Sequence, residues 1–368
     1  MEEDTMGNQH FYAPGYLREL ADELIGKMNL SLDGLTIYTE AASGAYLLSP
    51  VLAAAAGASK VYAQTRNSRF GTAEKVMHDT RQLAVDSGVS ECVEITDSRR
   101  LDWLAESDII TNSGFVRPID RELVTALKET AVIPLMWETW EFRESDFDLA
   151  ACKERGILVL GTVENREPCH LIPYCGFIAL KLLFAIGFDG RPVLVLGNAP
   201  YPGGSIVSQL RGAGMEVVWF SAQPESDYRY SDLRAYFKKH GQRFGNIILA
   251  EHVYPGLLLG SSGYLDMETI KTVNPRVRIG LICGNVDADE LKQSGLVYAP
   301  EQIAPFGFMS YQPYELGPRP VQLLYAAGLK VGEAMARARL AGLTVKEAAK
   351  KAIENSPAMD FKRGLAWL

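Results

Sequence analysis

The feature that most constrains the fold is an alternation of short β-branched and apolar runs with helical stretches, which begins near residue 31. In residues 31–165 the predicted strands are Leu35–Thr39, Lys60–Gln64, Cys92–Ile95, Asp108–Thr111, Val132–Met136 and Ile157–Leu160. The predicted helices are Tyr16–Met28, Ala45–Ala56, Thr72–Ser87, Arg121–Lys128 and Asp148–Arg155. Strands that alternate with helices in this way predict a mostly parallel, doubly wound sheet.

A second series of the same kind follows a long predicted helix at about Pro173–Ile186. Its predicted strands are Val193–Leu196, Glu216–Phe220, Asn246–Leu249, Arg278–Cys283 and Leu296–Ala299. The tail, from Pro318 to about Glu354, predicts further helix. We therefore expect an α/β fold of two doubly wound, Rossmann-like lobes with a cleft between them. Residues 1–165 and about 305–368 would form one lobe, and about 170–304 the other.

Composition narrows the functions open to such a chain. The 368 residues are 47% hydrophobic and 22% charged, as in globular proteins, and no apolar run is long enough to cross a bilayer. A net charge of −8 without a basic stripe argues against a nucleic-acid partner. Five cysteines without a CxxC pair and five scattered histidines argue against disulfides and a metal site. The acidic start lacks a signal-peptide pattern, so we expect a cytoplasmic protein with a small-molecule ligand.

The strongest local motif is a glycine-containing turn after the predicted strand Val193–Leu196. The turn precedes a helix predicted at Ser205–Gly212. Such a turn directs backbone N–H groups and the positive end of the helix toward a pyrophosphate. The usual GxGxxG pattern is altered, because alanine takes the second glycine position and two prolines lengthen the turn. A tight structural turn is the alternative to a dinucleotide site. The residues expected to bind the dinucleotide are Gly197, Asn198, Ala199, Tyr201, Pro202, Gly203 and Gly204.

The residues after the next strand bear on which dinucleotide binds. An acidic side chain there would hold the ribose hydroxyls of NAD, and residues 220–223 contain none. Ser221 could accept the 2′-phosphate of NADP, although no arginine lies immediately beside it in the sequence. The expected cofactor is therefore NADP or NAD, with a slight preference for NADP.

Five segments resemble, in the same order, parts of the D-2-hydroxyacid dehydrogenase family, the group of formate, glycerate and phosphoglycerate dehydrogenases. They are Asp108–Ser113, Ile119–Leu123, Phe147–Val159, Leu249–Pro255 and Gly284–Leu291. The resemblance implies a substrate-binding first lobe and a dinucleotide-binding second lobe. It also implies that His252 and Pro255 lie beside the nicotinamide ribose.

Three features depart from the pattern of that family. The family binds the substrate carboxylate with an arginine and moves a proton with a histidine paired to a glutamate. The resemblance puts Cys283 at the arginine position and Glu301 at the histidine position, and Trp137–Arg143 replaces the glycine-rich substrate loop. Without that arginine a simple 2-hydroxy acid is a poor substrate, and an amine, hydroxylated or cationic substrate is a better one.

The candidate catalytic residues are therefore Glu301, Glu138 and His252. A carboxylate can act as acid and base when burial raises its pKa toward neutrality. The structural alternatives are an exposed loop acid for Glu301 and a solvated loop for Glu138. Cys283 is expected to contact the cofactor, or else to be a small core residue.

The candidate substrate-binding residues come from three parts of the chain. They are Ser113, Trp137, Trp140, Arg143 and Arg319. Arg319 follows a long aromatic, Pro-rich loop of the kind that forms lids, where it could meet an anionic group. Alternatively, Arg319 pairs with an acid at the domain junction.

These patterns predict an NAD(P)-dependent oxidoreductase that acts on a small substrate in the cleft between the lobes. A dinucleotide-binding relative without redox chemistry is the alternative, because the family's arginine and histidine are missing. A third interpretation, a methyltransferase that uses the single-glycine turn Glu40–Tyr46, competes with a plain structural turn. The family resemblance also suggests a homodimer. The short apolar runs predict no membrane partner.

Overall fold

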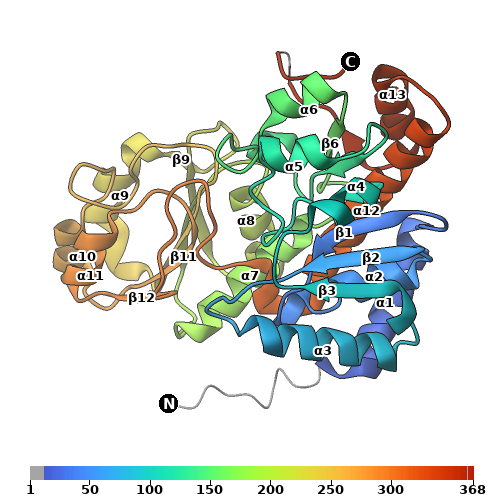
Figure 1. Ribbon diagram of the computed structural model, residues 1–368. Helices are drawn as coiled ribbons and strands as arrows, with labels where there is room; N and C mark the ends of the chain where they lie inside the picture. Colours follow the sequence, from blue (N-terminus) through green and yellow to red (C-terminus); the bar gives the residue numbers. More distant parts are fainter. Residues whose placement is uncertain (1–11, 363) are drawn as a thin grey trace. The chain divides into compact units, whose positions relative to one another are not determined.

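The structure, a computed structural model, describes residues 12–362 and 364–368. The acidic start, on which the expected location depends, lies outside the described residues. The chain forms two compact units (Figure 1). One contains the residues up to Leu171 together with Gly317–Leu368, and the other is Ile172–Leu316. No helix of the described residues combines the length and the apolar character needed to cross a bilayer.

The first unit is built on a seven-stranded sheet in the order β13-β6-β5-β4-β1-β2-β3. Its strands are β1 (Thr36–Glu40), β2 (Lys60–Gln64), β3 (Val93–Thr96), β4 (Ile109–Ile110), β5 (Val132–Pro134), β6 (Leu158–Thr162) and β13 (Ala358–Met359). Its helices are α1 (Pro14–Met28), α2 (Ser49–Ala55), α3 (Ala73–Asp86), α4 (Leu101–Glu106), α5 (Arg121–Ala126), α6 (Leu149–Arg155), α12 (Pro318–Leu340) and α13 (Val345–Asn355). β13 pairs antiparallel with β6, and the other pairs are parallel.

The second unit is built on a six-stranded sheet in the order β12-β11-β10-β7-β8-β9, with parallel pairing throughout. Its strands are β7 (Val193–Gly197), β8 (Val217–Ser221), β9 (Tyr228–Arg229), β10 (Asn246–Ala250), β11 (Arg278–Cys283) and β12 (Val297–Ala299). Its helices are α7 (Ile172–Ala185), α8 (Gly203–Gly212), α9 (Leu233–His240), α10 (Met267–Val273) and α11 (Ala288–Ser294). Both sheets are thus mostly parallel, as predicted.

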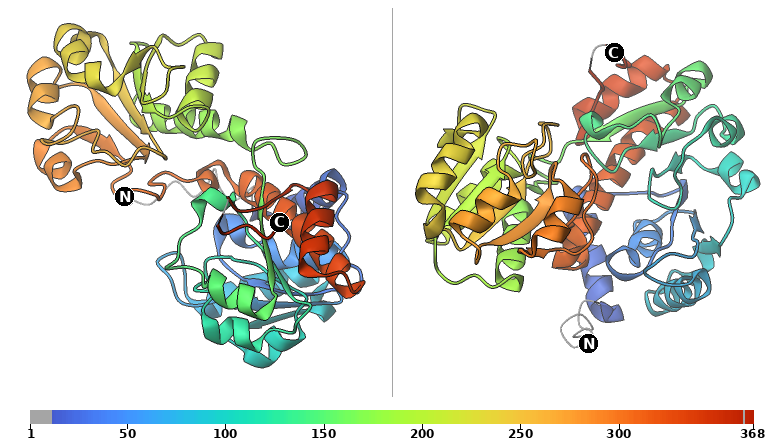
Figure 2. Two further views of the ribbon diagram at one scale, coloured as in Figure 1. Left: turned by 90° about the horizontal axis from the view of Figure 1, so that it is seen from above. Right: turned by 90° about the vertical axis from the view of Figure 1, so that its left-hand side faces the viewer.

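Helices cover both faces of the second sheet because its central strands are apolar on both sides (Figure 2). Leu194 and Leu196 of β7 pack in a core with α9, α10 and α11. The alternate residues Val193 and Val195 pack in a second core with α7 and α8. A strand buried on two faces in this way requires the continuous apolar run seen in the sequence.

The tail is helical, as predicted, and forms two helices that return to the first sheet. Gly342, with φ of +82°, lies between them, and Thr344 begins α13 with a capping box to Glu347. α12 lies directly on the sheet, since a Cβ at Gly332 would be 2.9 Å from Cγ2 of Ile109. The predicted helix Ala45–Ala56 also divides, into a 3-10 turn at Gly44–Tyr46 and α2.

The boundary expected near residue 305 lies instead after Leu316. The backbone N–H of Ser310 donates to the carbonyl of Ile282 at 2.7 Å, and Met309 forms an antiparallel bridge with Cys283. The aromatic, Pro-rich segment is therefore attached to β11 of the second unit.

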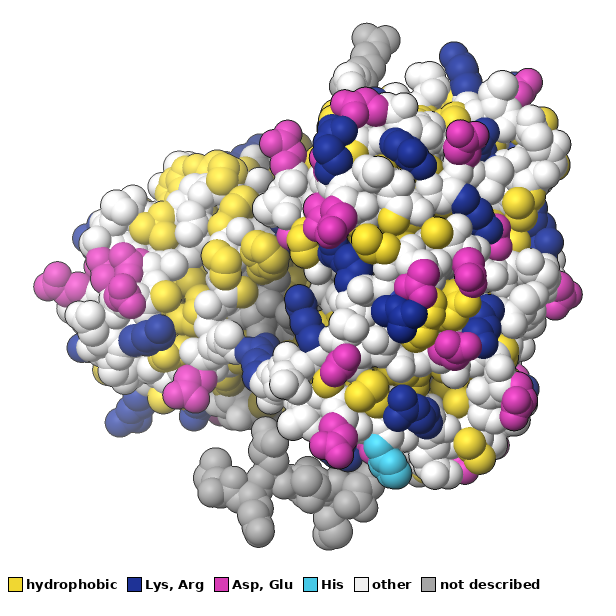
Figure 3. Space-filling model, viewed as in Figure 1, with side chains coloured by type: hydrophobic (Ala, Val, Ile, Leu, Met, Phe, Trp, Pro, Cys, Tyr) yellow, Lys and Arg dark blue, Asp and Glu magenta, His cyan; other side chains and the backbone are white. Residues whose placement is uncertain are grey.

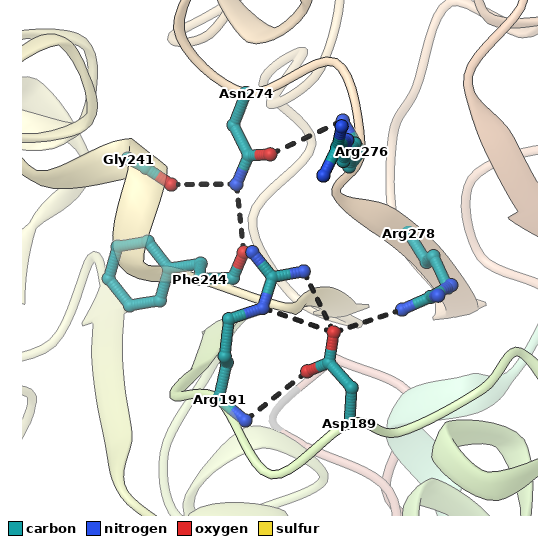
Figure 4. Close-up of polar contacts among 7 residues, drawn as sticks. All are labelled: Asp189, Arg191, Gly241, Phe244, Asn274, Arg276 and Arg278. Carbon is teal, nitrogen blue, oxygen red and sulfur yellow. Dashed lines mark hydrogen bonds and ion pairs between the residues drawn. The ribbon is translucent and has the colours of Figure 1, made fainter.

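Polar contacts tie together the amino ends of β7, β10 and β11 (Figure 4). Asp189 accepts hydrogen bonds from Arg191 at 2.8 Å and from Arg278 at 3.4 Å. The side-chain amide of Asn274 donates to the carbonyls of Gly241 and Phe244. These hydrogen bonds give the polar side chains at the amino edge a structural role. Open α/β sheets bind ligands at the opposite, carboxyl edge, and a ligand is expected there.

Charged side chains of both signs are interspersed over the first unit in the view of Figure 3. That face presents no continuous basic stripe.

Candidate functional site

The glycine turn lies at the carboxyl end of β7, between that strand and α8. A Cβ at Gly197 would lie 2.4 Å from the carbonyl oxygen of Ala250, and one at Gly203 would lie 2.4 Å from the carbonyl carbon of Gly197. Only glycine therefore permits this approach of the strand end to the start of the helix. α8 begins at Gly203, two residues before the predicted start, so the amino end of the helix belongs to the turn itself.

Asn198 organises the turn from a buried position. Its backbone carbonyl accepts from the N–H of Gly204 at 3.0 Å, and its side-chain oxygen accepts from the N–H of His252 at 2.9 Å. The indole N–H of Trp219 donates to the carbonyl of Gly197 at 2.7 Å. The turn after β7 and the loop after β10 are thus held as one surface.

The carboxyl end of β8 carries a hydroxyl group, from Ser221, and a side-chain amide, from Gln223. It has no acidic residue to hold the ribose hydroxyls of NAD. Ser221 is fully buried, and its hydroxyl is hydrogen-bonded to the side chain of Gln223. The same Gln223 oxygen accepts from the N–H of Ala199 at 3.3 Å. Ser221 is therefore less accessible to a phosphate than the sequence suggested.

Strand pairing brings an arginine to this position. Ser221 of β8 is in register with Arg229 of β9, and Arg229 donates to the carbonyl of Ala222 at 3.0 Å. Arg229 is exposed. The sequence alone did not reveal this neighbour, because β9 contains two residues and carries no strand pattern.

A buried carboxylate fixes the loop after β10. Glu251 is fully buried and accepts from the Tyr230 hydroxyl at 2.6 Å and from the N–H groups of Val253 and Tyr254 at 2.8 Å each. Burial and this carboxylate raise the pKa of Tyr230. His252 and Pro255 both lie on this loop. His252 is half-buried and Pro255 is exposed. Sequence reasoning named His252 but overlooked Glu251, the residue that fixes the backbone beside it.

The two remaining second-unit candidates occupy different environments at the same edge. Cys283 is 3% exposed, packs in the core formed with α7 and α8, and has a pKa raised by burial. Its side chain is thus a small core group, the alternative considered for it. Glu301 is exposed on the bend that follows β12. No burial of Glu301 is present to favour acid–base chemistry.

The loop after β5 in the first unit centres on Trp137. The guanidinium groups of Arg117 and Arg143 lie 4.9 Å and 5.5 Å from the centre of its ring. Both arginines bind the same oxygen of Asp146, at 2.8 Å and 3.2 Å. The sequence predicted Trp137 and Arg143 for this site but gave no signal for Arg117, which arrives from the loop after β4.

Glu138 has a structural role in the same loop. It is 5% exposed, accepts from the indole N–H of Trp140 at 2.7 Å, and accepts from the backbone N–H of Glu164 at 3.1 Å. The nearby Glu141 has a pKa raised to about 7, chiefly by burial. The pKa of Glu164 is also raised, by burial and by the other two carboxylates. Within the described residues, no group of His, Cys, Asp and Glu side chains is arranged to hold a metal ion.

Ser113 ends a chain of hydroxyl groups at the carboxyl edge of the first sheet. Its Oγ lies 2.8 Å from Oγ1 of Thr111, which donates to Thr39, and Tyr325 also donates to Thr39. Glu40, at the end of β1, is buried and accepts from the N–H of Phe115, and burial raises its pKa.

Arg319 lies outside this group of residues. Its guanidinium forms a bidentate ion pair with Glu23 of α1, at 2.6 Å and 2.7 Å, and lowers the pKa of that carboxyl. Pairing with an acid was the alternative to substrate binding, and Arg319 makes such a pair within the first unit.

Comparisons with known proteins establish the fold. No family model matches the sequence, and no curated protein matches it significantly. One of the subunits of dipicolinate synthase from Bacillus halodurans is similar over 82% of this chain and 99% of that chain, with a TM-score of 0.52 and 11% identity. A 2-hydroxyacid dehydrogenase from Ketogulonicigenium vulgare Y25 is similar over 85% and 98%, with a TM-score of 0.44 and 13% identity. A formate dehydrogenase from Granulicella M. is similar over 84% and 96%, with a TM-score of 0.44 and 11% identity. The similarity to the dipicolinate synthase subunit, at 11% identity, is evidence for the fold alone.

Proposed function

We propose that the chain is a nicotinamide-dinucleotide-dependent oxidoreductase whose second unit holds the dinucleotide at the carboxyl edge of its sheet. The observation that carries this proposal is the contact of Gly197 with Gly203, in which a Cβ on either residue would overlap backbone atoms. Such a contact brings backbone N–H groups and the start of α8 to one point, as a pyrophosphate requires. Asn198 would keep the turn in this shape, since it is buried and bonded to His252.

NADP(H) is the preferred form in this proposal. Gln223 stands near the end of β8 without the negative charge that would select the free ribose hydroxyls of NAD and repel a 2′-phosphate. Arg229, exposed and in register with Ser221, would supply the positive charge for that phosphate.

When bound, the dinucleotide supplies hydride transfer at C4 of its nicotinamide. His252 is the best candidate to hold or release the accompanying proton. Its backbone is fixed by Asn198, and the following N–H groups are fixed by Glu251. Glu301 is exposed and Glu138 is bonded to Trp140 and Glu164, so neither is prepared for this task.

Calorimetric titration with NAD, NADH, NADP and NADPH tests the proposal. We expect saturable binding, with the phosphorylated forms bound more tightly. Absence of binding by all four at millimolar concentration would overturn it.

A dinucleotide-binding protein without redox chemistry is the second candidate, and the environments of Cys283 and Glu301 favour it. The first is a core thiol and the second an exposed acid, so neither reproduces the arginine and histidine of the dehydrogenases that the sequence resembles. A screen for NADPH oxidation with oxo acids, imines and ketones separates the two candidates. NADPH oxidation with any of these substrates rejects the non-redox candidate. A reduced rate in His252→Gln shows that the oxidation belongs to this protein.

A further inference from the structure

We propose that the carboxyl edge of the first sheet binds an anionic group, a carboxylate or a phosphate, through Arg117, Asn112 and Trp137. The inference deepens the proposed function, on which it rests for the assignment of that group to the substrate. The binding of the anion itself can be tested without the dinucleotide.

Three buried nitrogen atoms on the loops after β4 and β5 have no hydrogen-bond partner. They are Nε of Arg117, Nδ2 of Asn112 and Nε1 of Trp137. The Asn112 side chain is 1% exposed, and its oxygen accepts from the N–H of Met136 at 2.7 Å, which leaves the NH₂ group as the unsatisfied part. The residue after Met136 is Trp137, and the Arg117 guanidinium lies 4.9 Å from its ring.

All three unsatisfied groups are donors, and this decides the chemistry of the ligand. A guanidinium N–H and an indole N–H cannot accept, and the Asn112 oxygen is already occupied. Leaving a buried donor without a partner is unfavourable, so a set of three calls for a ligand made of acceptors. Carboxylates and phosphates present acceptor oxygens alone and carry the charge that an arginine binds most strongly.

The charge of the loop points the same way. Arg117 and Arg143 share one oxygen of Asp146, and Arg66 reaches the carbonyl of Gly114 beside them. Two guanidinium groups on one carboxylate leave one positive charge unbalanced. The other acids of this region are Glu40, Glu138, Glu141 and Glu164. Burial raises the pKa of Glu40, Glu141 and Glu164, and Glu138 accepts from Trp140 and from the N–H of Glu164.

The sequence suggested an amine, hydroxylated or cationic substrate, because the resemblance puts Cys283 where the dehydrogenases have an arginine. The structure offers another arginine, on a different unit and after a different strand. An anionic substrate is thus compatible with a cysteine at position 283 in place of the arginine.

The test is titration of the whole protein with oxalate and, separately, with inorganic phosphate, followed by calorimetry and by the indole N–H resonances. We expect binding of at least one anion and movement of the Trp137 resonance, identified by its loss in Trp137→Phe. Arg117→Met should weaken binding by about tenfold or more. Trp137→Phe, which keeps a ring for the arginines to stack on, should weaken it less. Arg121→Met is the matched control, because Arg121 pairs with Glu154 on α5 and α6, and it should bind as the unaltered protein does.

The two anions identify the source of the chemistry: tighter binding of oxalate indicates a carboxylate ligand, and tighter binding of phosphate a phosphorylated one. Absence of binding by both, or equal binding by Arg117→Met and Arg121→Met, overturns the inference. If Arg117→Met lowers the melting temperature, the anion affinity of Trp137→Phe decides instead, and an affinity equal to that of the unaltered protein overturns the inference. Dinucleotide titration of the same samples keeps the two proposals apart. Anion binding that depends on Arg117 without dinucleotide binding would remove the proposed function and leave the anion site.

Discussion

Arg229 and Ser221 show how much of a site depends on single residues that the chain brings together from a distance. They are eight positions apart, yet β8 and β9 place them in register at the sheet edge. The sequence indicated Ser221 and the absence of an acid after β8. It could not indicate Arg229, because the position of an arginine beside Ser221 follows from a two-residue parallel pairing.

Arg229→Ala should weaken NADPH binding by about tenfold, which corresponds to ~1.4 kcal/mol, because it removes the charge opposite the 2′-phosphate. NADH binding should change little, since NADH lacks that phosphate. Calorimetry on both ligands measures the ratio. Lys271→Ala on α10 is the control, as it removes one exposed positive charge from the same unit. Equal loss for NADPH and NADH would contradict the assigned role.

At the scale of elements, a buried carboxylate determines the shape of the loop after β10. Beyond the end of the strand the backbone N–H groups have no neighbouring strand, and Glu251 accepts their hydrogen bonds instead. Glu251 accepts three hydrogen bonds, one from Tyr230 and two from the N–H groups that follow it. Tyr230 in turn packs in the core with α9, α10 and α11. The position of His252 is therefore connected to the packing of one face of the sheet.

Tyr230→Phe should destabilise the protein by about 1.5–3 kcal/mol, since it removes a hydrogen bond to a buried charge while keeping the ring. Urea unfolding followed by circular dichroism measures the change. Tyr298→Phe, on a half-buried tyrosine of β12 that packs against the same core, is the matched control. A loss no larger than that of the control would show that the Tyr230 hydroxyl contributes nothing.

Glu141, in the loop Trp137–Arg143, should make the free energy of unfolding depend on pH. Burial raises the pKa of Glu141 from 4.5 to about 7, so the folded protein holds a proton that the unfolded chain has released. The folded state then binds more protons, and the free energy of unfolding should fall as the pH rises from about 4.5 to about 7. In Glu141→Gln this part of the fall should be absent. Urea titrations across that range test it, with Glu144→Gln, an exposed neighbour, as the control. Parallel profiles for all three proteins would count against the assigned pKa.

At the scale of the whole molecule, the second unit is one continuous segment, whereas the first depends on a returning tail. Both cores around the second sheet draw their residues from Ile172–Leu316. The first sheet needs α12, which packs directly against it at Gly332.

A fragment of residues 172–316 should therefore fold alone and unfold cooperatively in urea. It should also bind dinucleotide with an affinity similar to that of the full chain. Residues 12–171, which lack α12, should not unfold cooperatively. A fragment 172–316 without a cooperative transition would show that its two cores are insufficient.

The sequence was most informative where strands are buried on both faces. Lys60–Gln64 and Arg278–Cys283 agree with the structure at both ends, because each has an apolar interior that follows a basic residue. The edge strands β9 and β13 were not predicted, since two residues carry no periodicity. The same limit applies to the site. The glycine turn is a local motif, but the meeting of Arg117 with Trp137 exists only once β4 and β5 lie side by side.

Binding of a dinucleotide by the turn after β7 is tested most directly by one pair of variants. A Cβ at Gly203 would meet the backbone of Gly197, whereas one at Gly212, in the same helix, meets nothing within 4 Å. In calorimetric titration with NADPH, the unaltered protein and Gly212→Ala should bind alike, and Gly203→Ala should lose binding. Equal binding by all three, or binding by none, would contradict dinucleotide binding by this turn.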